Sequence, residues 1–267
     1  MAEYSLKLSD VELARYELMA AKAREVEAEL WAKAGVVAGA TIADIGCGPG
    51  AVAVALARHV GPEGRVLAVD GAAEAVAMAR AVTERAGVAN VVVEEARAEA
   101  TPVPPGSVDV VMIRHVLAHN GGREAAIVGH AASLVRPGGC VYLVDVAITA
   151  LQTRPSDPDL EDLNARYRQW HERQGNDLSV GLRLSELLEE AGLETIEFGG
   201  RFDIISPAPG FRPPSIAAKQ SLIDAGLATE DDVARWEAAF RRMDGLERRP
   251  VVFAPVFCAI GRRPTAR

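Results

Sequence analysis

The sequence predicts a doubly wound α/β fold, in which a mostly parallel sheet is covered by helices on both faces. Short runs rich in Val, Ile and Ala alternate with stretches of good helix formers between residues 41 and 148. A glycine-rich turn follows the first apolar run, reading T-I-A-D-I-G-C-G-P-G at 41–50, and a second run, V-L-A-V-D at 66–70, ends on a carboxylate. Near-continuous apolar strands of this kind are typical of a parallel sheet that is buried on both faces.

The expected elements follow one another in a regular order up to residue 148. A capping box, Ser9-Asp10-Val11-Glu12, begins a helix that we expect to run to about Ala34. The strands are expected at 41–45, 65–69, 90–94, 108–113 and 139–148. The helices between them are expected at 50–60, 72–86 and 121–135.

The alternation breaks at residues 151–180, where Pro and Asp residues precede a polar, aromatic helix expected around 166–174. It resumes with a helix at 181–191 and a strand at 193–204. A Pro-rich loop at 205–215, two short helices and a last strand at 251–260 complete the expected elements.

The composition is that of a soluble globular protein with one sizeable core: 267 residues, 49% hydrophobic and 25% charged. The net charge of −8 argues against a sequence-independent grip on nucleic acid or on an anionic membrane. Cys47, Cys140 and Cys258 form neither a CxxC pair nor an even set, which favours three reduced thiols. The N-terminus is polar and no apolar run approaches a membrane span, so we expect a cytoplasmic protein.

Asp44 is the most informative residue of the glycine turn. A carboxylate at this place repels a pyrophosphate but suits a nucleoside ligand that carries an ammonium or a sulfonium group. A dinucleotide-binding turn stays open as the alternative, because Gly46, Gly48 and Ala51 also satisfy the looser G-x-G-x-x-A pattern.

Four motifs in order carry a resemblance to a known family. The D-x-G-x-G-x-G pattern at 44–50, the acid that closes the second strand and the R-P-G-G turn at 136–139 together resemble the class I S-adenosylmethionine-dependent methyltransferases. The stretch V-D-V-V-M-I-R-H-V-L-A-H-N from Val108 is similar to the ubiquinone and menaquinone biosynthesis branch of that family. The resemblance implies a Rossmann-like sheet of seven strands, whose last strand at 251–260 is antiparallel and forms a hairpin with 193–204.

The resemblance also implies a domain organisation and a cofactor, S-adenosyl-L-methionine. The expected parts are a helical lid at 1–35, the cofactor-binding core at 36–150, a cap insert at 151–180, and the completion of the sheet at 181–267 with substrate-side helices at 211–245. The residues that it assigns to the cofactor are Asp44, Gly46, Cys47, Gly48, Asp70, Gly71, Arg97, Ala98 and Arg114.

Within this set, Asp44 and the amides of Gly46 and Cys47 are expected to meet the ammonium and carboxylate of the methionine moiety. Asp70 is expected to accept both ribose hydroxyls, for which a carboxylate is well shaped; capping of helix 72–86 is its structural alternative. Arg97 departs from the family, since relatives place there an Asp that accepts from the adenine amino group, and an arginine cannot accept. Backbone groups of Arg97 and Ala98, or the stacked guanidinium, are the two ways left open to read adenine.

His115 is the first candidate for a general base and Tyr16 the second. His119, four residues after His115, shares a helical face with it, and a packing role is favoured over a metal site because no third ligand lies at an interpretable distance. No metal is therefore expected. The strand-four end also lacks an N-P-P-[FY] motif, which disfavours methylation of nucleic-acid amino groups.

Nine of the thirteen aromatic residues lie after residue 150. Either they line a cavity for an aromatic or apolar ligand or they fill a second small core beneath a lid. The residues concerned are Tyr167, Trp170, Phe198, Phe202 and Phe211, of which Tyr167, Trp170 and Phe211 are expected to contact the substrate together with His119.

The expected function is methyl transfer to a small aromatic or heteroaromatic metabolite, without a nucleic-acid or membrane partner. The Ala-, Val- and Arg-rich character of the sequence and the stretch R-H-V-L-A-H-N-G-G-R-E from Arg114 to Glu124 resemble actinobacterial secondary-metabolite enzymes. Some of these enzymes methylate an indole carbon, so carbon is favoured over oxygen or nitrogen. The alternatives are a nicotinamide-dependent oxidoreductase, and a nucleoside-binding protein or cyclase that transfers no methyl group. The acceptor atom, the substrate and the oligomeric state stay open, a homodimer included.

Overall fold

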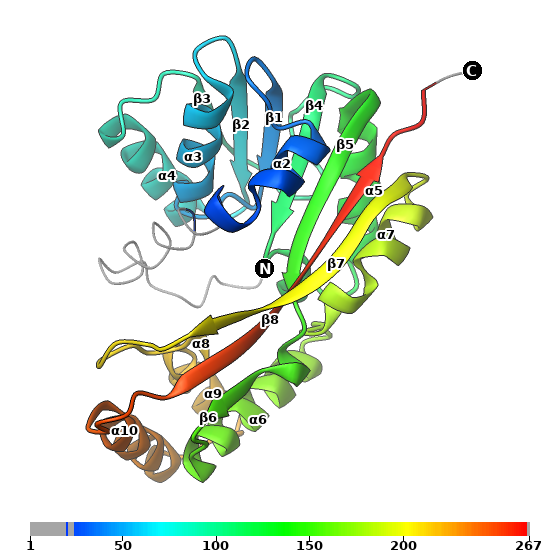
Figure 1. The fold of residues 1–267 in the computed structure, drawn as a ribbon. Coiled ribbons are helices and arrows are strands. Elements are labelled where there is room, and N and C mark those ends of the chain that lie inside the picture. Colours follow the sequence, from blue (N-terminus) through cyan, green and yellow to red (C-terminus); the bar gives the residue numbers. More distant parts are fainter. Residues whose placement is uncertain (1–19, 21–23, 266–267) are drawn as a thin grey trace.

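An eight-stranded sheet forms the centre of the protein in a computed structural model that describes residues 20 and 24–265 (Figure 1). The strand order is β3-β2-β1-β4-β5-β8, with β6 and β7 also paired to β8, and the first five strands are parallel. Their bounds are β1 Thr41–Ile45, β2 Arg65–Asp70, β3 Val91–Glu95, β4 Val108–Arg114 and β5 Val135–Val146. The predicted doubly wound, mostly parallel fold is confirmed.

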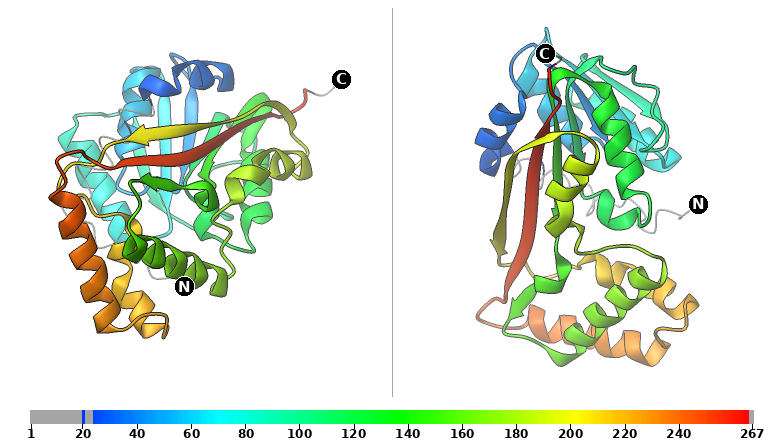
Figure 2. Two further views of the ribbon diagram at one scale, coloured as in Figure 1. Left: turned by 60° about the horizontal axis from the view of Figure 1, so that its bottom comes forward. Right: turned by 90° about the vertical axis from the view of Figure 1, so that its right-hand side faces the viewer.

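Helices cover both faces of the parallel part (Figure 2). Side chains alternate between two cores along each strand: on β4, Met112 lies in the first core and Val111 and Ile113 lie in the second. The first core is covered by α2 Ala28–Ala34, α3 Ala51–Val60 and α4 Ala73–Arg85, and the second by α5 Glu124–Leu134 and α7 Leu184–Glu190.

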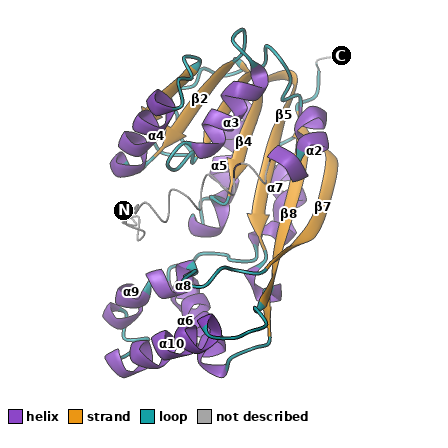
Figure 3. Cartoon of the chain, turned by 60° about the vertical axis from the view of Figure 1, so that its left-hand side comes forward, coloured by secondary structure: helices purple, strands orange, loops and turns teal. Residues whose placement is uncertain are grey.

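A helical lobe lies beyond the carboxyl ends of the parallel strands (Figures 1 and 3). Its own small core includes the fully buried Leu222 and Trp236. The Trp236 indole donates to Asp162 Oδ2 at 3.0 Å, and Arg166 donates to both oxygens of Asp232 at 2.8 and 3.1 Å. The lobe contains α6 Pro158–Arg173, α8 Pro214–Ala217, α9 Lys219–Asp224 and α10 Glu230–Asp244. The segments expected as a cap insert and as substrate-side helices therefore pack together around one core.

A long antiparallel ribbon of β7 (Glu194–Ile205) and β8 (Val251–Arg262) joins this lobe to the sheet. Residues 256–262 of β8 pair with β5, and residues 251–253 pair with the short β6 (Gln152–Arg154). The antiparallel pairing expected of the last strand is confirmed. The two strands are, however, not joined by a turn, because α8, α9 and α10 lie between them in the chain.

Two features of the helical lobe differ from the expectation. α6 begins at Pro158 instead of near 166, because the Asp157 side chain caps it by accepting from Asp159 N at 2.9 Å. Three helices, not two short ones, precede β8, since Thr229 and Asp232 form a capping box that begins the 15-residue α10. The capping box at Ser9–Glu12 lies outside the described residues. Within residues 24–265, no helix is both long and apolar enough to cross a bilayer.

Candidate functional site

The glycine turn lies at the carboxyl edge of the sheet, where β1, β2 and β4 end side by side. Gly46 has a φ of +74°, and a Cβ there would lie 2.3 Å from Cγ2 of Val116. Gly50 has a φ of +82°, and its Cβ would lie 3.0 Å from the backbone of Ala79. Both positions require glycine, because other residues rarely adopt this conformation and no side chain fits.

Asp70, at the end of β2, ties the turn to the next helix. Its Oδ2 accepts from Gly48 N and its Oδ1 accepts from Ala72 N, both at 2.9 Å. The side chain thus closes the turn that precedes α4. This role is close to the structural alternative expected for Asp70, the capping of that helix. Each carboxylate oxygen has a second lone pair, so the group can still accept from two ligand hydroxyls. Gly71 is exposed beside it.

The amides of Gly46 and Cys47 both donate to Val69 O, at 2.7 and 3.0 Å. The expectation that they meet a ligand carboxylate is therefore corrected, because the turn folds back onto β2 and uses both donors. The Cys47 side chain is buried, and desolvation, with Asp44 and Asp70 nearby, raises the pKa of its thiol far above the ordinary range.

Asp44 is only 2% exposed, and its Oδ2 has no hydrogen-bond partner among residues 24–265. Desolvation raises the pKa of this carboxyl to about 7; the charge of Arg114 opposes the shift and that of Asp70 adds to it. A buried acceptor without a partner is rare and costly, and a cationic ligand group would satisfy it.

Arg114 lies at the end of β4 in a buried polar cluster centred on Glu27, here called the Glu27 cluster. Glu27, fully buried, forms an ion pair with Arg114 and accepts from Tyr142 Oη at 2.7 Å and from Arg201 Nη2 at 2.8 Å. Burial raises the pKa of Glu27, but the charge of Arg114 and the hydrogen bonds from all three partners outweigh it, so the net shift is downward.

Glu27 was not identified as a candidate site residue from the sequence, although its spacing from apolar residues could have indicated burial. Trp31 and Ala34, four and seven residues further on, are both buried, so Glu27 is a carboxylate on the apolar face of its helix.

His115 follows Arg114 with a φ of +55°, a conformation that a residue other than glycine adopts at a cost. Its amide donates to Val144 O at 2.8 Å, which holds it beside β5. Desolvation and the charge of Arg114 lower the pKa of His115 to about 3, against the opposing charge of Glu27. The imidazole is therefore neutral at pH 7, the form that can accept a proton.

Three of the expected substrate contacts gather in one place. The rings of His119, Tyr167 and Trp170 surround His171, with centroid separations of 5.1, 4.5 and 4.7 Å from its ring. These four residues are called the aromatic cluster below. His171 was not anticipated, yet Leu163, Tyr167 and His171 are buried at a spacing of four along α6, which places a histidine on an apolar stripe.

The remaining expected residues lie elsewhere. Phe211 is exposed in the loop before α8, and Phe198 and Phe202 lie exposed on β7. Tyr16 lies outside the described residues. Among those described, no group of three His, Cys, Asp or Glu side chains is placed to hold a metal ion.

Arg97 and Ala98, the residues expected to contact adenine, present no side-chain hydrogen-bond acceptor. The Arg97 side chain is 70% exposed and forms an ion pair with Glu99, which also pairs with Arg123. Its carbonyl accepts from Ala100 N at 3.0 Å, so this backbone oxygen already has a partner. Ala98 packs against the core beneath α5.

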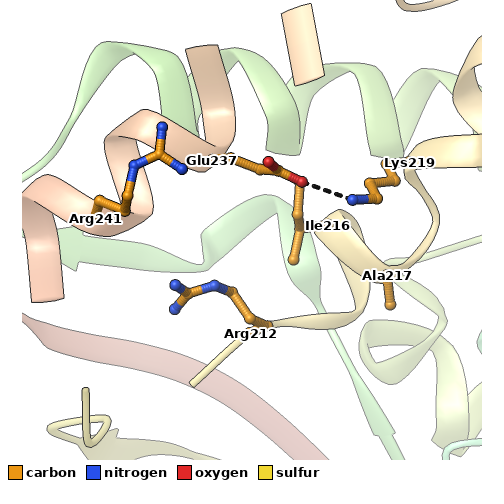
Figure 4. A pocket seen from close by; sticks show the side chains of 6 residues that line it. All are labelled: Arg212, Ile216, Ala217, Lys219, Glu237 and Arg241. Atoms are coloured by element: carbon orange, nitrogen blue, oxygen red, sulfur yellow. Dashed lines mark hydrogen bonds and ion pairs between the residues drawn. The ribbon is translucent and has the colours of Figure 1, made fainter. Parts of the chain in front are cut away.

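A separate surface pocket of about 400 Å³ lies in the helical lobe (Figure 4). None of the expected site residues belongs to it. A Lys219–Glu237 ion pair of 2.6 Å lies along its wall. It is lined by Arg212, Ile216, Ala217, Lys219, Glu237 and Arg241.

Comparison with known proteins identifies the domain family of the core. Residues 42–139 match the profile of a methyltransferase domain. They form a class I S-adenosylmethionine-dependent methyltransferase domain. The match includes the glycine turn, Asp70 and the R-P-G-G turn.

Two curated relatives are also described as methyltransferases. The chain is 25% identical to the demethylmenaquinone methyltransferase of Lactococcus lactis subsp. lactis, over 61% of this chain and 69% of that protein. It is 41% identical to a ubiquinone biosynthesis O-methyltransferase of Cupriavidus pinatubonensis, over 40% and 41% of the two chains. The chain spans about half the length of several of the curated relatives that it matches.

The fold extends beyond the matched segment. The YcgJ protein of Bacillus subtilis superposes with a TM-score of 0.58 at 20% identity, covering 90% of this chain and 98% of that one. At this identity the likeness concerns the fold alone.

S-adenosylmethionine, the cofactor of this class of domain, fits the residues present. Within the described residues, Asp44 Oδ2 is a buried acceptor without a partner, and it lies directly before the glycine turn. A cationic ligand suits the Asp44 carboxylate better than a pyrophosphate, whose negative charge this carboxylate repels.

Proposed function

We propose that the protein transfers a methyl group from S-adenosylmethionine to a small aromatic or heteroaromatic molecule. Methylation of carbon, an indole carbon in particular, is favoured over methylation of oxygen or nitrogen. The observation that carries the cofactor half is the buried Asp44 carboxylate beside the glycine turn, whose Oδ2 has no partner in the described part of the chain. The acceptor half is supported by the aromatic cluster, whose His119 lies five residues after the end of β4.

The residues of the core hold the cofactor in this proposal. Asp44 faces its positive charge, Asp70 accepts from the ribose hydroxyls, and the glycines let the backbone approach closely. When bound, S-adenosylmethionine supplies an activated methyl group on a sulfonium. The main task left to the protein is to orient the acceptor, and orientation of this kind is worth on the order of 7–11 kcal/mol at best.

His115 is proposed to accept a proton from the acceptor. Its burial beside Arg114 keeps the imidazole neutral at pH 7. A positioned base contributes about 10²–10⁴-fold when its pKa lies near the working pH, and the low pKa of His115 makes it a weak base whose contribution is expected at the lower end. Tyr16 keeps its place as the second candidate base.

The test combines binding with turnover. Calorimetry with S-adenosylmethionine and with NAD separates this proposal from an oxidoreductase; we expect binding of the first only. Release of S-adenosylhomocysteine is then followed over a panel of indoles and phenols, and its absence across the panel favours a protein that binds the nucleoside without transferring methyl. Single-turnover rates of His115→Ala decide the base role, since an unchanged rate removes it.

We propose a cytoplasmic enzyme without a nucleic-acid partner, and a homodimer stays open. Sedimentation of the purified chain gives the oligomeric state.

A further inference from the structure

His171 presents a buried polar atom that the proposed function does not use. The residue is 5% exposed, and its Nε2 has no hydrogen-bond partner within the described part of the chain. It lies on α6 in the helical lobe, but its ring contacts His119, which belongs to the segment after β4. The unpartnered nitrogen is thus placed where the helical lobe meets the carboxyl edge of the sheet.

Neighbouring hydrogen bonds determine which proton this nitrogen carries. Gly121 N, which can only donate, is 3.0 Å from Asn176 Oδ1, so the amide of Asn176 has a defined orientation. Its Nδ2 therefore donates to His171 Nδ1, at 3.0 Å. In a neutral imidazole whose Nδ1 accepts, the hydrogen is on Nε2. His171 consequently offers a hydrogen-bond donor, not a base.

Two further observations support this state. Desolvation, with His119 nearby, lowers the pKa of His171 to about 4, so the ring is neutral at pH 7. The network is also held in place by backbone packing: a Cβ at Gly121 would lie 1.8 Å from Gly175 O. The two turns are in direct contact, and Asn176 has little freedom to turn over.

The aromatic cluster is accessible at one residue. The His119 side chain is exposed, although surrounding protein desolvates it and lowers its pKa. Tyr167 and Trp170 contact the His171 ring from two other directions, so a planar ligand entering past His119 would meet aromatic surfaces and the Nε2 hydrogen together.

We propose that His171 Nε2–H donates a hydrogen bond to an oxygen on the aromatic acceptor, a carbonyl attached to the ring, and thereby selects aryl carbonyl compounds. This rests on the proposed function for the bound molecule to be the methyl acceptor. The Nε2–H is already buried and unpaired before binding, so a ligand with the oxygen gains a hydrogen bond that a ligand without it lacks, which corresponds to a preference of about fivefold to tenfold.

The test uses two indoles of similar shape, 3-acetylindole and 3-ethylindole, titrated calorimetrically into the full chain at pH 8 with and without S-adenosylhomocysteine. Wild type is expected to prefer 3-acetylindole by about fivefold to tenfold, and His171→Phe, which keeps a planar ring without the N–H, is expected to bind both equally. Equal affinities in wild type, or no binding of either indole, overturn the inference.

Asn176→Asp provides a second variant that changes no atom of His171. Its carboxylate can only accept, so at pH 8 it requires the hydrogen on Nδ1 and turns Nε2 into an acceptor; the preference should disappear. Imidazole ¹⁵N shifts report the tautomer without any ligand, and an Nδ1–H signal for wild-type His171 contradicts the inference. Failure of S-adenosylhomocysteine to bind refutes the proposed function instead, while the indole titrations without it still decide the role of His171.

Discussion

Replacement of Glu27 by alanine is expected to destabilise the protein more than any surface substitution. The side chain is fully buried and has three partners, Arg114, Tyr142 and Arg201. Removing one member of a buried ion pair costs about 3–5 kcal/mol. Since the Arg114 and Arg201 side chains keep 11% and 26% of their exposure and can be rehydrated, we expect the lower end, about 3 kcal/mol. Such a loss lowers the Tm by about 6–12 °C in a chain of this size.

Urea titrations followed by circular dichroism measure this change, and a loss below about 1 kcal/mol refutes the reasoning. Lys33→Ala is the matched control on the same helix, because Lys33 pairs with Glu197 at 2.6 Å but both side chains are substantially exposed. It should cost less than about 1 kcal/mol.

The pH dependence of Glu27 gives an independent measure. Its folded pKa lies below its ordinary value of 4.5, so its contribution is complete above pH 4.5 and is lost as the pH falls through the folded pKa. Glu27→Gln should therefore lose less stability than wild type between pH 5 and pH 3. Parallel curves for the two proteins contradict the assignment.

Three other tests use substitutions, one of them with a control substitution. The pKa of Asp44, raised to about 7 by desolvation, lies above its unfolded value. The free energy of unfolding without ligand should therefore fall as the pH rises from 4 to 7, while the affinity for S-adenosylmethionine should rise as the pH increases through 7. Asp44→Asn should flatten the first trend in urea titrations and the second in calorimetry. Gly121→Ala, whose Cβ meets Gly175 O at 1.8 Å, should cost about 1–3 kcal/mol, whereas Gly129→Ala in an open position of α5 should be neutral or stabilising. Arg97→Ala should leave the Tm unchanged, because the side chain is 70% exposed, and a loss of cofactor affinity in this variant would support guanidinium stacking on adenine.

Local patterns in the sequence were sufficient to place the glycine turn beside the acid that ends the next strand. An apolar run, a glycine turn and an acid at the end of the next strand occur within 30 residues, and parallel pairing of β1 with β2 brings them to one edge. Val116 beneath Gly46 and the hydrogen bonds that Val69 O accepts from the turn were not predictable, because they depend on side-chain shape and on backbone direction after β4. The same bonds explain why the two amides were wrongly assigned to a ligand.

Residues that act across the fold were harder to find. Glu27 meets Arg201, 174 positions away, only because β7 pairs with β8 and passes next to α2. His171 meets His119 through the docking of α6 against the segment after β4. Each is a polar residue on an apolar helical stripe, a pattern that shows burial but not the partner. The partner follows from tertiary contacts, which spacing along the chain does not contain.

The strand β8 has a mechanical consequence. Its twelve residues are hydrogen-bonded to β5 at one end and to β6 at the other, with β7 alongside for almost the whole length. This pairing opposes a hinge motion between the helical lobe and the sheet. Moving the lobe away from the sheet would require bending β7 and β8 together or breaking the hydrogen bonds between them. Ligand exchange should then proceed by local movements at the rim, and small-angle scattering should show the same dimensions with and without cofactor.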